Sequence, residues 1–360
     1  MHNIQVTKPH LPDKAKYKKY IDEIYNRCQL TNHGILVKEL ERRLAEYLNL
    51  DEIILVANGT MALNIAYRAL EIKNEVITSP FSFVATTNSL IAGGLTPIFS
   101  DIDSKSFNID PSLIASKVNK KTTAIVPVHS FGNACDVEAI EEIGKNNNLK
   151  IIYDAAHAFD VSYKKKNLLN YGDISTLSLH ATKLFHTIEG GAIIVNDKAL
   201  IKKVRRLIDF GYDKSGVILN AGINAKMNEF EAAMGLCVLD DIISIKANRK
   251  KLFDFYSREL GKFLTFQLWN KHASQNYAYC PIIFRDEEQL LKTQKKLNEN
   301  SIFPRRYFYP SLDLLPYVIK AQKCEHSQNI SKRILCLPLY DELSLTDAKR
   351  ITDLIKKCIL

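Results

Sequence analysis

Apolar side chains recur along the first hundred residues with two different periods. Residues 40–50 (LERRLAEYLNL) carry them at helical spacing, and residues 60–70 and 84–92 repeat this pattern. Short apolar runs at 52–56 and 75–78 lie between these segments. An alternation of strand and helix patterns is typical of βαβ units, so we expect parallel strands joined by helices.

The same rhythm continues toward the middle of the chain. A helical pattern covers residues 137–148, and strand patterns cover residues 96–102, 123–129, 149–155 and 175–179. The runs AIVPV and KIIYD are apolar at nearly every position, as a strand must be when helices cover both faces of its sheet. The pattern therefore predicts an α/β fold class with a mostly parallel sheet.

The C-terminal third follows a different pattern. A long helical pattern runs from about 228 to 260 and is followed by a strand pattern at 275–285, a helix pattern at 287–299 and a strand pattern at 333–339. We expect a smaller C-terminal α+β domain here. The sequence predicts a large domain at 1–245 and a small domain at 246–360.

Composition agrees with a globular protein of two domains. The chain has 360 residues, of which 46% are hydrophobic and 25% charged, close to the average of globular proteins. No apolar run approaches the ~20 residues that cross a bilayer. The first ten residues, MHNIQVTKPH, lack the apolar core of a secretory signal. We therefore expect a cytoplasmic protein without a membrane partner.

The net charge and the motifs narrow the class of ligand. The formal charge is +9, but the basic clusters have no interleaved aromatic array, so no nucleic-acid partner is predicted. A small anionic ligand suits this charge. The seven cysteines are scattered without metal spacing, so neither a metal site nor a disulfide framework is expected. Neither GxGxxG nor GxxxxGK[ST] occurs, which disfavours a Rossmann dinucleotide site and a P-loop.

Several chemically able residues follow predicted strands. Because ligands of open α/β sheets bind beyond the carboxyl ends of the strands, these residues are expected to converge. Gly59 and Thr60 open a helix, where free amides suit a phosphate, although capping alone also explains them. Asp154 could cap a helix or hold a proton on a pyridine nitrogen. Lys183 could form a Schiff base with pyridoxal phosphate if its pKa is lowered; otherwise it is a solvated lysine.

Ten ordered segments resemble one known family across essentially the whole chain. They are similar to the sugar-nucleotide aminotransferases of the DegT/StrS group, which are fold type I pyridoxal phosphate enzymes with a large sheet domain and a smaller C-terminal domain. The segments are LTNHG (30–34), NGTMAL (58–63), EVITSPFSFVATTN (75–88), DIDSKSFNIDP (101–111), VHSFGNACD (128–136), DAAHA (154–158), GD (172–173), SLHATK with EGG (178–191), GINAKMNEFEAAMG (222–235) and RRYFYP (305–310).

The resemblance implies a role for the residues nearest the cofactor. Lys183 matches the Schiff-base lysine, and Asp154 matches the partner of the pyridine nitrogen. His157 occupies the position near the phenolic oxygen of the cofactor. Phe83 falls where an aromatic ring stacks on the pyridine face. Lysine at position 183 favours transamination, because related dehydratases have histidine there.

The resemblance also implies a phosphate cup and a dimer. Gly59, Thr60 and Ser178 match the phosphate cup. Asn224 matches an asparagine that reaches the phosphate of the neighbouring subunit, so a homodimer with a shared active site is expected. Lys226 departs from the arginine of many relatives; it keeps the charge but loses the bidentate fork.

The implied reaction moves an amino group from L-glutamate to C-4 of dTDP-4-keto-6-deoxy-D-glucose. The product would be dTDP-4-amino-4,6-dideoxy-D-glucose for cell-surface O-antigen synthesis, with 2-oxoglutarate released. Ser178, His180 and Lys183 followed by Glu-Gly-Gly favour C-4 over C-3. The residues expected to contact the sugar nucleotide are Asn32, His180, Arg306 and Tyr309.

Two alternatives remain open at this stage. One is an aminotransferase that acts at C-3 of a keto sugar. The other is a regulatory protein that binds pyridoxal phosphate without turnover, although no DNA-binding extension is visible. His186 has no predicted role.

Overall fold

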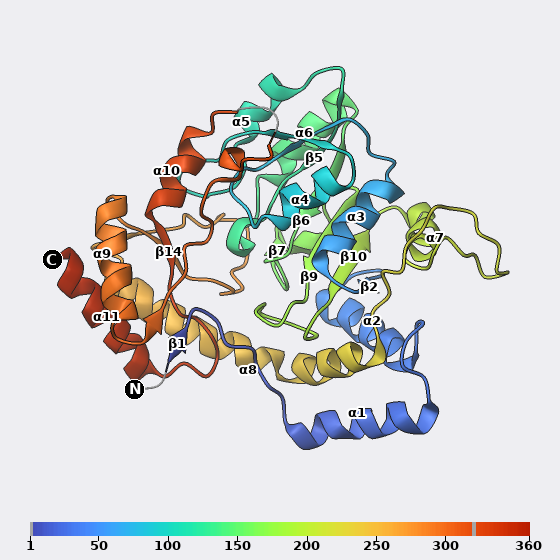
Figure 1. Ribbon diagram of the computed structural model, residues 1–360, viewed down its shortest axis with the longest axis horizontal. Coiled ribbons are helices and arrows are strands. Elements are labelled where there is room, and N and C mark those ends of the chain that lie inside the picture. Colours follow the sequence, from blue (N-terminus) through green and yellow to red (C-terminus); the bar gives the residue numbers. More distant parts are fainter. Residues whose placement is uncertain (1–2, 319–321) are drawn as a thin grey trace.

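A seven-stranded sheet forms the centre of the larger part of the molecule (Figure 1). The computed structural model describes residues 3–318 and 322–360. The strand order is β2-β10-β9-β6-β5-β3-β4, and β10 alone runs antiparallel to its neighbours. The α/β class with a mostly parallel sheet is thereby confirmed. The strands are β2 (Ile54–Val56), β3 (Glu75–Thr78), β4 (Thr96–Phe99), β5 (Thr122–Val126), β6 (Lys150–Asp154), β9 (Ile174–Ser178) and β10 (Gly191–Val195).

Helices cover both faces of this sheet and make it the middle of three layers. Side chains alternate along each strand, so Leu55 packs into one core while Ile54 and Val56 pack into the other. The first core contains α2 (Ile35–Leu48), α6 (Val137–Asn147) and the first half of α8 (Glu229–Leu260). The second core contains α3 (Gly59–Ala69), α4 (Ala85–Ala92) and α7 (Lys198–Leu207).

The smaller part is built around a three-stranded antiparallel sheet. Its order is β11-β12-β14, and α9, α10 and α11 accompany it. The N-terminal strand also belongs here, because β1 pairs in parallel with β13 and Ile4 lies in the core of this part. These elements are β1 (Ile4–Gln5), β11 (Thr265–Phe266), β12 (Pro281–Ile283), α9 (Glu287–Asn298), β13 (Ile302–Phe303), α10 (Glu325–Arg333), β14 (Ile334–Cys336) and α11 (Leu345–Ile359).

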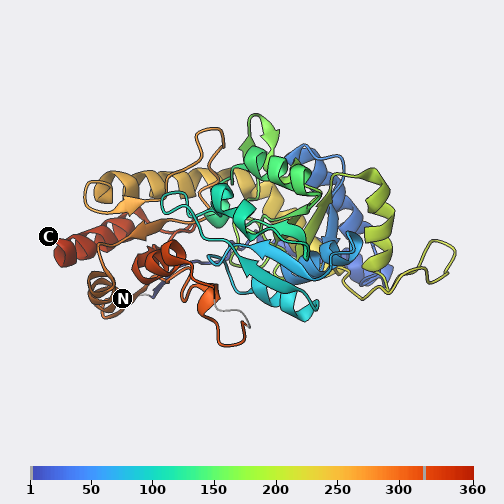
Figure 2. The same ribbon diagram turned by 90° about the horizontal axis from the view of Figure 1, so that it is seen from above.

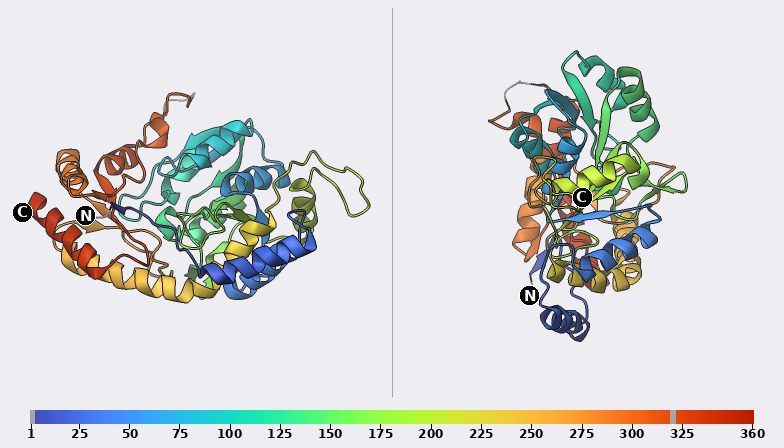
Figure 3. Two further views of the ribbon diagram at one scale, coloured as in Figure 1. Left: turned by 60° about the horizontal axis from the view of Figure 1, so that its bottom comes forward. Right: turned by 90° about the vertical axis from the view of Figure 1, so that its right-hand side faces the viewer.

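Helix α8 joins the two parts along one side of the molecule (Figure 3). It begins with a capping box, in which the Asn228 side chain accepts from the Glu231 amide. Ile245 packs into the large core, whereas Leu252 and Tyr256 pack into the small one. Helix α8 therefore passes from one core to the other between Ile245 and Leu252, near the predicted boundary. Strand β1 belongs to the smaller part although it lies at the N-terminus. The division at 245 stays a prediction.

A hairpin projects from the body between α7 and α8 (Figure 2). Its two arms are held by an antiparallel bridge between Tyr212 and Ile218.

Helix α1 (Lys14–Arg27) packs beside α8 (Figure 3). None of the helices in residues 3–318 and 322–360 is both long and apolar enough to span a bilayer. The short elements are α5 (Pro111–Ile114), β7 (Ser162–Tyr163), β8 (Lys166–Asn167) and 3-10 turns at Ala115–Lys117, Ser130–Gly132, Leu168–Asn170 and Leu312–Leu314.

Candidate active site

The carboxyl ends of β2, β6 and β9 open into a cavity of about 310 Å³. Residues Tyr279, Arg305, Tyr307 and Phe308 of the smaller part close one of its sides. A ligand site at this edge is what a parallel sheet favours. Most sequence-predicted residues line the cavity: Gly59, Thr60, Phe83, Asp154, His157, Ser178, His180 and Lys183.

The amine of Lys183 lies in this cavity with an unusual pKa. Burial lowers the pKa of Lys183 to about 8, and the carboxylate of Asp154 opposes that effect. At pH 7.5 such an amine is neutral roughly a quarter of the time, against about one part in a thousand for an ordinary lysine. The Nζ atom donates a hydrogen bond of 3.3 Å to the Tyr279 hydroxyl. Lys183 is therefore suited to act as a nucleophile.

Asp154 ends β6 and faces the cavity with its carboxylate fixed. Oδ2 accepts from the Thr86 hydroxyl at 2.7 Å, and Oδ1 accepts from the Ala156 amide at 3.1 Å. Burial raises the pKa of Asp154, while these two donors and the charge of Lys183 oppose the rise. Turns rather than a helix follow Asp154, so the capping alternative does not apply. The carboxylate is free to bind a cationic group in the cavity.

His157 is a neutral ring in the cavity wall. Burial, with the charge of Lys183, lowers the pKa of His157 far below its usual value. Nδ1 accepts from the Phe131 amide at 3.2 Å, which leaves Nε2–H as a donor. Its ring lies 4.5 Å from that of Tyr279. Phe83 is 53% exposed although it is a large aromatic residue, and it lines the same cavity.

The start of α3 forms an anion cradle at one end of the cavity. Asn58 caps the helix by accepting from the Met61 amide at 2.9 Å. Amides in the first turn lack acceptors within the helix, and the helix dipole attracts an anion to them. A Cβ at Gly59 would lie 3.0 Å from the Ser178 Cβ, and one at Gly191 would lie 2.4 Å from the Asn58 carbonyl carbon. Glycine at these positions lets three chain segments meet behind the cradle.

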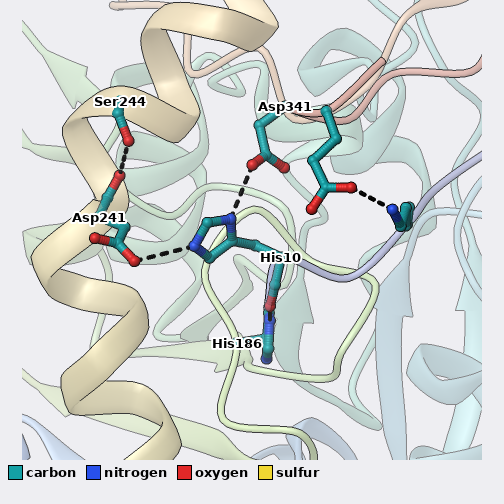
Figure 4. A network of polar contacts seen from close by, with 7 residues as sticks. His10, His186, Asp241, Ser244 and Asp341 are labelled. Atoms are coloured by element: carbon teal, nitrogen blue, oxygen red, sulfur yellow. Dashed lines mark hydrogen bonds and ion pairs between the residues drawn. The ribbon is translucent and has the colours of Figure 1, made fainter. Parts of the chain in front are cut away.

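The loop that carries Lys183 is tied to three other parts of the chain (Figure 4). His186 accepts from the Ile188 amide through Nδ1, so its Nε2–H donates to the His10 carbonyl oxygen at 2.8 Å. The His10 ring contacts Asp341 at 2.8 Å and Asp241 at 3.1 Å. The Asp341 hydrogen bond raises the pKa of His10, with Asp241 adding to the rise, against the effect of burial. His186 thus has a structural role that the sequence did not indicate.

Four sequence-predicted residues lie outside the lining of this cavity. Asn32 is exposed in the loop before α2, and Asn224 is exposed beside the projecting hairpin. Arg306 donates to Glu287 at 2.6 Å, and Tyr309 lies 3.6 Å from its guanidinium. The roles of these residues stay predictions.

Other cavity residues were missed by sequence reasoning. Thr86 lies inside the VATTN segment of the resemblance, but nothing in the sequence showed that its hydroxyl reaches Asp154. Arg305 lines the cavity although its neighbour Arg306 was predicted. No sequence pattern pointed to Tyr279, because it lies about a hundred residues from Lys183 along the chain.

Comparison with known proteins identifies the family. Residues 12–356 match the DegT/DnrJ/EryC1/StrS aminotransferase family. The chain belongs to this family. It is therefore an aminotransferase, and its cofactor is pyridoxal phosphate.

Individual members of the family are similar over nearly the whole chain. The aminotransferase is 40% identical to dTDP-4-amino-4,6-dideoxy-D-glucose transaminase of Shigella dysenteriae, with 98% of each chain covered. It is 38% identical to the protein of the same name from Escherichia coli, again with 98% coverage of both. The crystal structure of DesI with its TDP-sugar product superposes with a TM-score of 0.94 at 29% identity, covering 100% of this chain and 93% of that one.

The residues of the cavity fit pyridoxal phosphate. An amine of lowered pKa suits the aldehyde, a fixed carboxylate suits the ring nitrogen, and the first turn of α3 suits the phosphate. Lys183, Asp154 and the amides of Gly59 and Thr60 are the groups that would hold it. The fit to the cofactor therefore rests on an amine, a carboxylate and backbone amides that lie in one cavity.

The pH dependence of cofactor attachment tests the lowered pKa. Cofactor-free protein mixed with pyridoxal phosphate is expected to form the covalent link faster as the pH rises, levelling off above about 8, because the neutral amine of Lys183 reacts. Stopped-flow absorbance measures this rate. Asp154→Asn removes the charge that raises the pKa of Lys183, so its midpoint is expected to move to lower pH. A rate that still climbs at pH 10 in the wild type would contradict the assignment.

Proposed function

We propose that this aminotransferase moves the amino group of L-glutamate to C-4 of dTDP-4-keto-6-deoxy-D-glucose, giving dTDP-4-amino-4,6-dideoxy-D-glucose. The observation that carries the proposal is the meeting of the Lys183 amine and the Asp154 carboxylate in one cavity beside a helix N-terminus. The two relatives at 40% and 38% identity, matched over 98% of their length, support the choice of sugar.

Each residue has a defined task in this reaction. Bound pyridoxal phosphate would supply the electron sink and carry the amino group between the two substrates. Lys183 would anchor the cofactor and, once displaced, take the proton from Cα of glutamate and return one at C-4 of the sugar. Asp154 would keep the ring nitrogen protonated. His157 would donate a hydrogen bond from Nε2 to the phenolic oxygen of the cofactor, because its Nδ1 already accepts from the Phe131 amide.

Amination at C-4 is favoured over amination at C-3. His180 and Glu189, two members of the C-4 signature, both line the cavity and approach each other to 3.4 Å. GDP-perosamine synthase of Escherichia coli O157:H7 is 30% identical to this chain, less than the relatives named for a dTDP sugar, which favours a dTDP sugar as substrate.

Amination at C-3 remains the second candidate. The regulatory alternative is excluded by membership in an aminotransferase family. Use of the product in O-antigen synthesis belongs to this proposal, and the cytoplasmic location stays a prediction.

Product analysis tests the reaction directly. The protein incubated with pyridoxal phosphate, L-glutamate and dTDP-4-keto-6-deoxy-D-glucose is expected to give a sugar whose amino group NMR places on C-4, together with 2-oxoglutarate. GDP- and UDP-linked 4-keto sugars serve as competitors and are expected to react more slowly. An amine on C-3, or preference for another nucleotide, would refute that part of the proposal.

We also propose that two copies of the chain form a dimer with shared active sites. The projecting hairpin exposes five large apolar side chains, which a monomer in water would not favour. They are Phe210, Tyr212, Val217, Ile218 and Leu219. Figure 2 shows this hairpin standing clear of the rest of its own chain.

The residues at the base of the hairpin support this arrangement. Asn224 forms a bridge with Asp209 and is exposed, outside the cavity of its own chain, so it is available to a second copy. Lys226 forms an ion pair with Asp209 and lies 5.0 Å from the Phe210 ring, so its charge stabilises the base of the hairpin. That contact gives the lysine a role within this chain that does not need the arginine fork of relatives.

A charged hairpin is expected to break the dimer. Ile218→Asp combined with Leu219→Asp places two carboxylates where the partner would pack, so light scattering is expected to report a monomer and transaminase activity is expected to fall at least tenfold. Leu291→Asp, at an exposed apolar position on α9, is the control and is expected to remain dimeric. A doubly substituted protein that stays dimeric and active would contradict the shared site.

A further inference from the structure

Tyr279 comes from the smaller part of the molecule yet reaches the amine of Lys183. Its hydroxyl accepts a hydrogen bond of 3.3 Å from Nζ. Asn276, three residues earlier, fixes this segment by donating to the backbone oxygens of His157 and Phe159 at 2.8 and 2.9 Å. The buried Arg249 of α8 donates to the Ala278 oxygen at 3.2 Å. The backbone on which Tyr279 sits is therefore held against the site.

The ring of Tyr279 is held from several directions. Its centroid lies 4.5 Å from that of His157, 5.7 Å from that of Phe131 and 6.0 Å from that of Tyr307. The last two contacts are edge-to-face, an arrangement that aromatic pairs prefer. With the ring enclosed in this way, the hydroxyl remains directed at Lys183.

The Tyr279 hydroxyl stays neutral in this setting. Burial raises the pKa of Tyr279 well above its usual value. The Asp154 carboxylate acts on the charge of Lys183, whereas burial keeps His157 neutral. A neutral phenol can hold an amine by hydrogen bonding.

We propose that Tyr279 is a positioning residue whose hydroxyl holds the amine of Lys183 in the cavity whenever that amine is free. A released lysine side chain has four rotatable methylene groups, and its amine must stay near the substrate carbon to exchange a proton there. The phenol on the facing wall provides a fixed partner. The inference rests on the role that the proposed function gives to Lys183.

The first test measures Lys183 in cofactor-free protein and needs no activity. The phenol oxygen accepts from the ammonium and so favours its charged form; Tyr279→Phe is therefore expected to lower the pKa of Lys183 below its wild-type value of about 8. The pH dependence of Lys183 acetylation by acetic anhydride, followed by mass spectrometry, reports this pKa. An unchanged pKa would overturn the inference.

The second test separates positioning from stability. Tyr279→Phe is expected to lower kcat about tenfold while leaving KM for L-glutamate within about twofold, and to raise the isotope effect with glutamate deuterated at Cα. Tyr256→Phe is the matched control. It removes the hydroxyl of a fully buried tyrosine away from the cavity, which donates to the Pro338 oxygen at 3.0 Å in the small core, and is expected to lower only Tm. Equal kinetic effects in the two variants would refute the positioning role.

These tests distinguish failure of the proposed function from failure of the role of Tyr279. If the wild type does not transaminate, the proposed function fails, yet the acetylation profile still decides whether Tyr279 holds Lys183. If Tyr279→Phe does not fold, the pair Tyr279→Gln and Tyr279→Leu makes the same comparison, because the two side chains are similar in size and only the amide accepts a hydrogen bond. Equal Lys183 pKa values in that pair would overturn the inference.

Discussion

Burial of the Lys183 amine opposite the Asp154 carboxylate is the interaction on which the site depends. A buried ammonium is costly, and the protein lowers that cost by reducing the pKa to about 8 and by supplying the carboxylate and the Tyr279 hydroxyl as neighbours. The same desolvation makes the amine reactive near neutral pH. Burial that would be a defect in a structural core would therefore supply the neutral amine that the proposed reaction needs.

The sheet explains why these groups meet. Asp154 and Ser178 end neighbouring parallel strands, β6 and β9, so their side chains emerge at one edge. The antiparallel β10 starts beside the turn between β2 and α3, and Gly191 allows that approach because a side chain there would collide with Asn58. The loop between β9 and β10 carries Lys183, and the His186 to His10 contact ties it to the N-terminal segment (Figure 4). Residues distant from the chemistry thus fix the position of the lysine.

The sequence predicted the parts of the site that follow from local pattern. Strand patterns located the ends at Asp154 and Ser178, and the resemblance named Lys183. Contacts between segments that are distant along the chain could not be predicted, because no local sequence pattern indicates them. Whether Arg305 or Arg306 faces the cavity depends on how their strand-like segment pairs with Cys336, a contact about thirty residues away. Tyr279 reaches Lys183 only through the packing of the smaller part, and β10 and α7 escaped prediction, as did α1, α10 and α11.

The most direct test of the account is the site at which the cofactor is attached. Holoenzyme reduced with sodium borohydride and digested with trypsin is predicted to yield one pyridoxyl-labelled peptide, with the label on Lys183 by tandem mass spectrometry. The same treatment of Lys183→Ala is predicted to yield none. A label on another lysine, or a labelled peptide from Lys183→Ala, would contradict the central claim that this buried amine carries the cofactor.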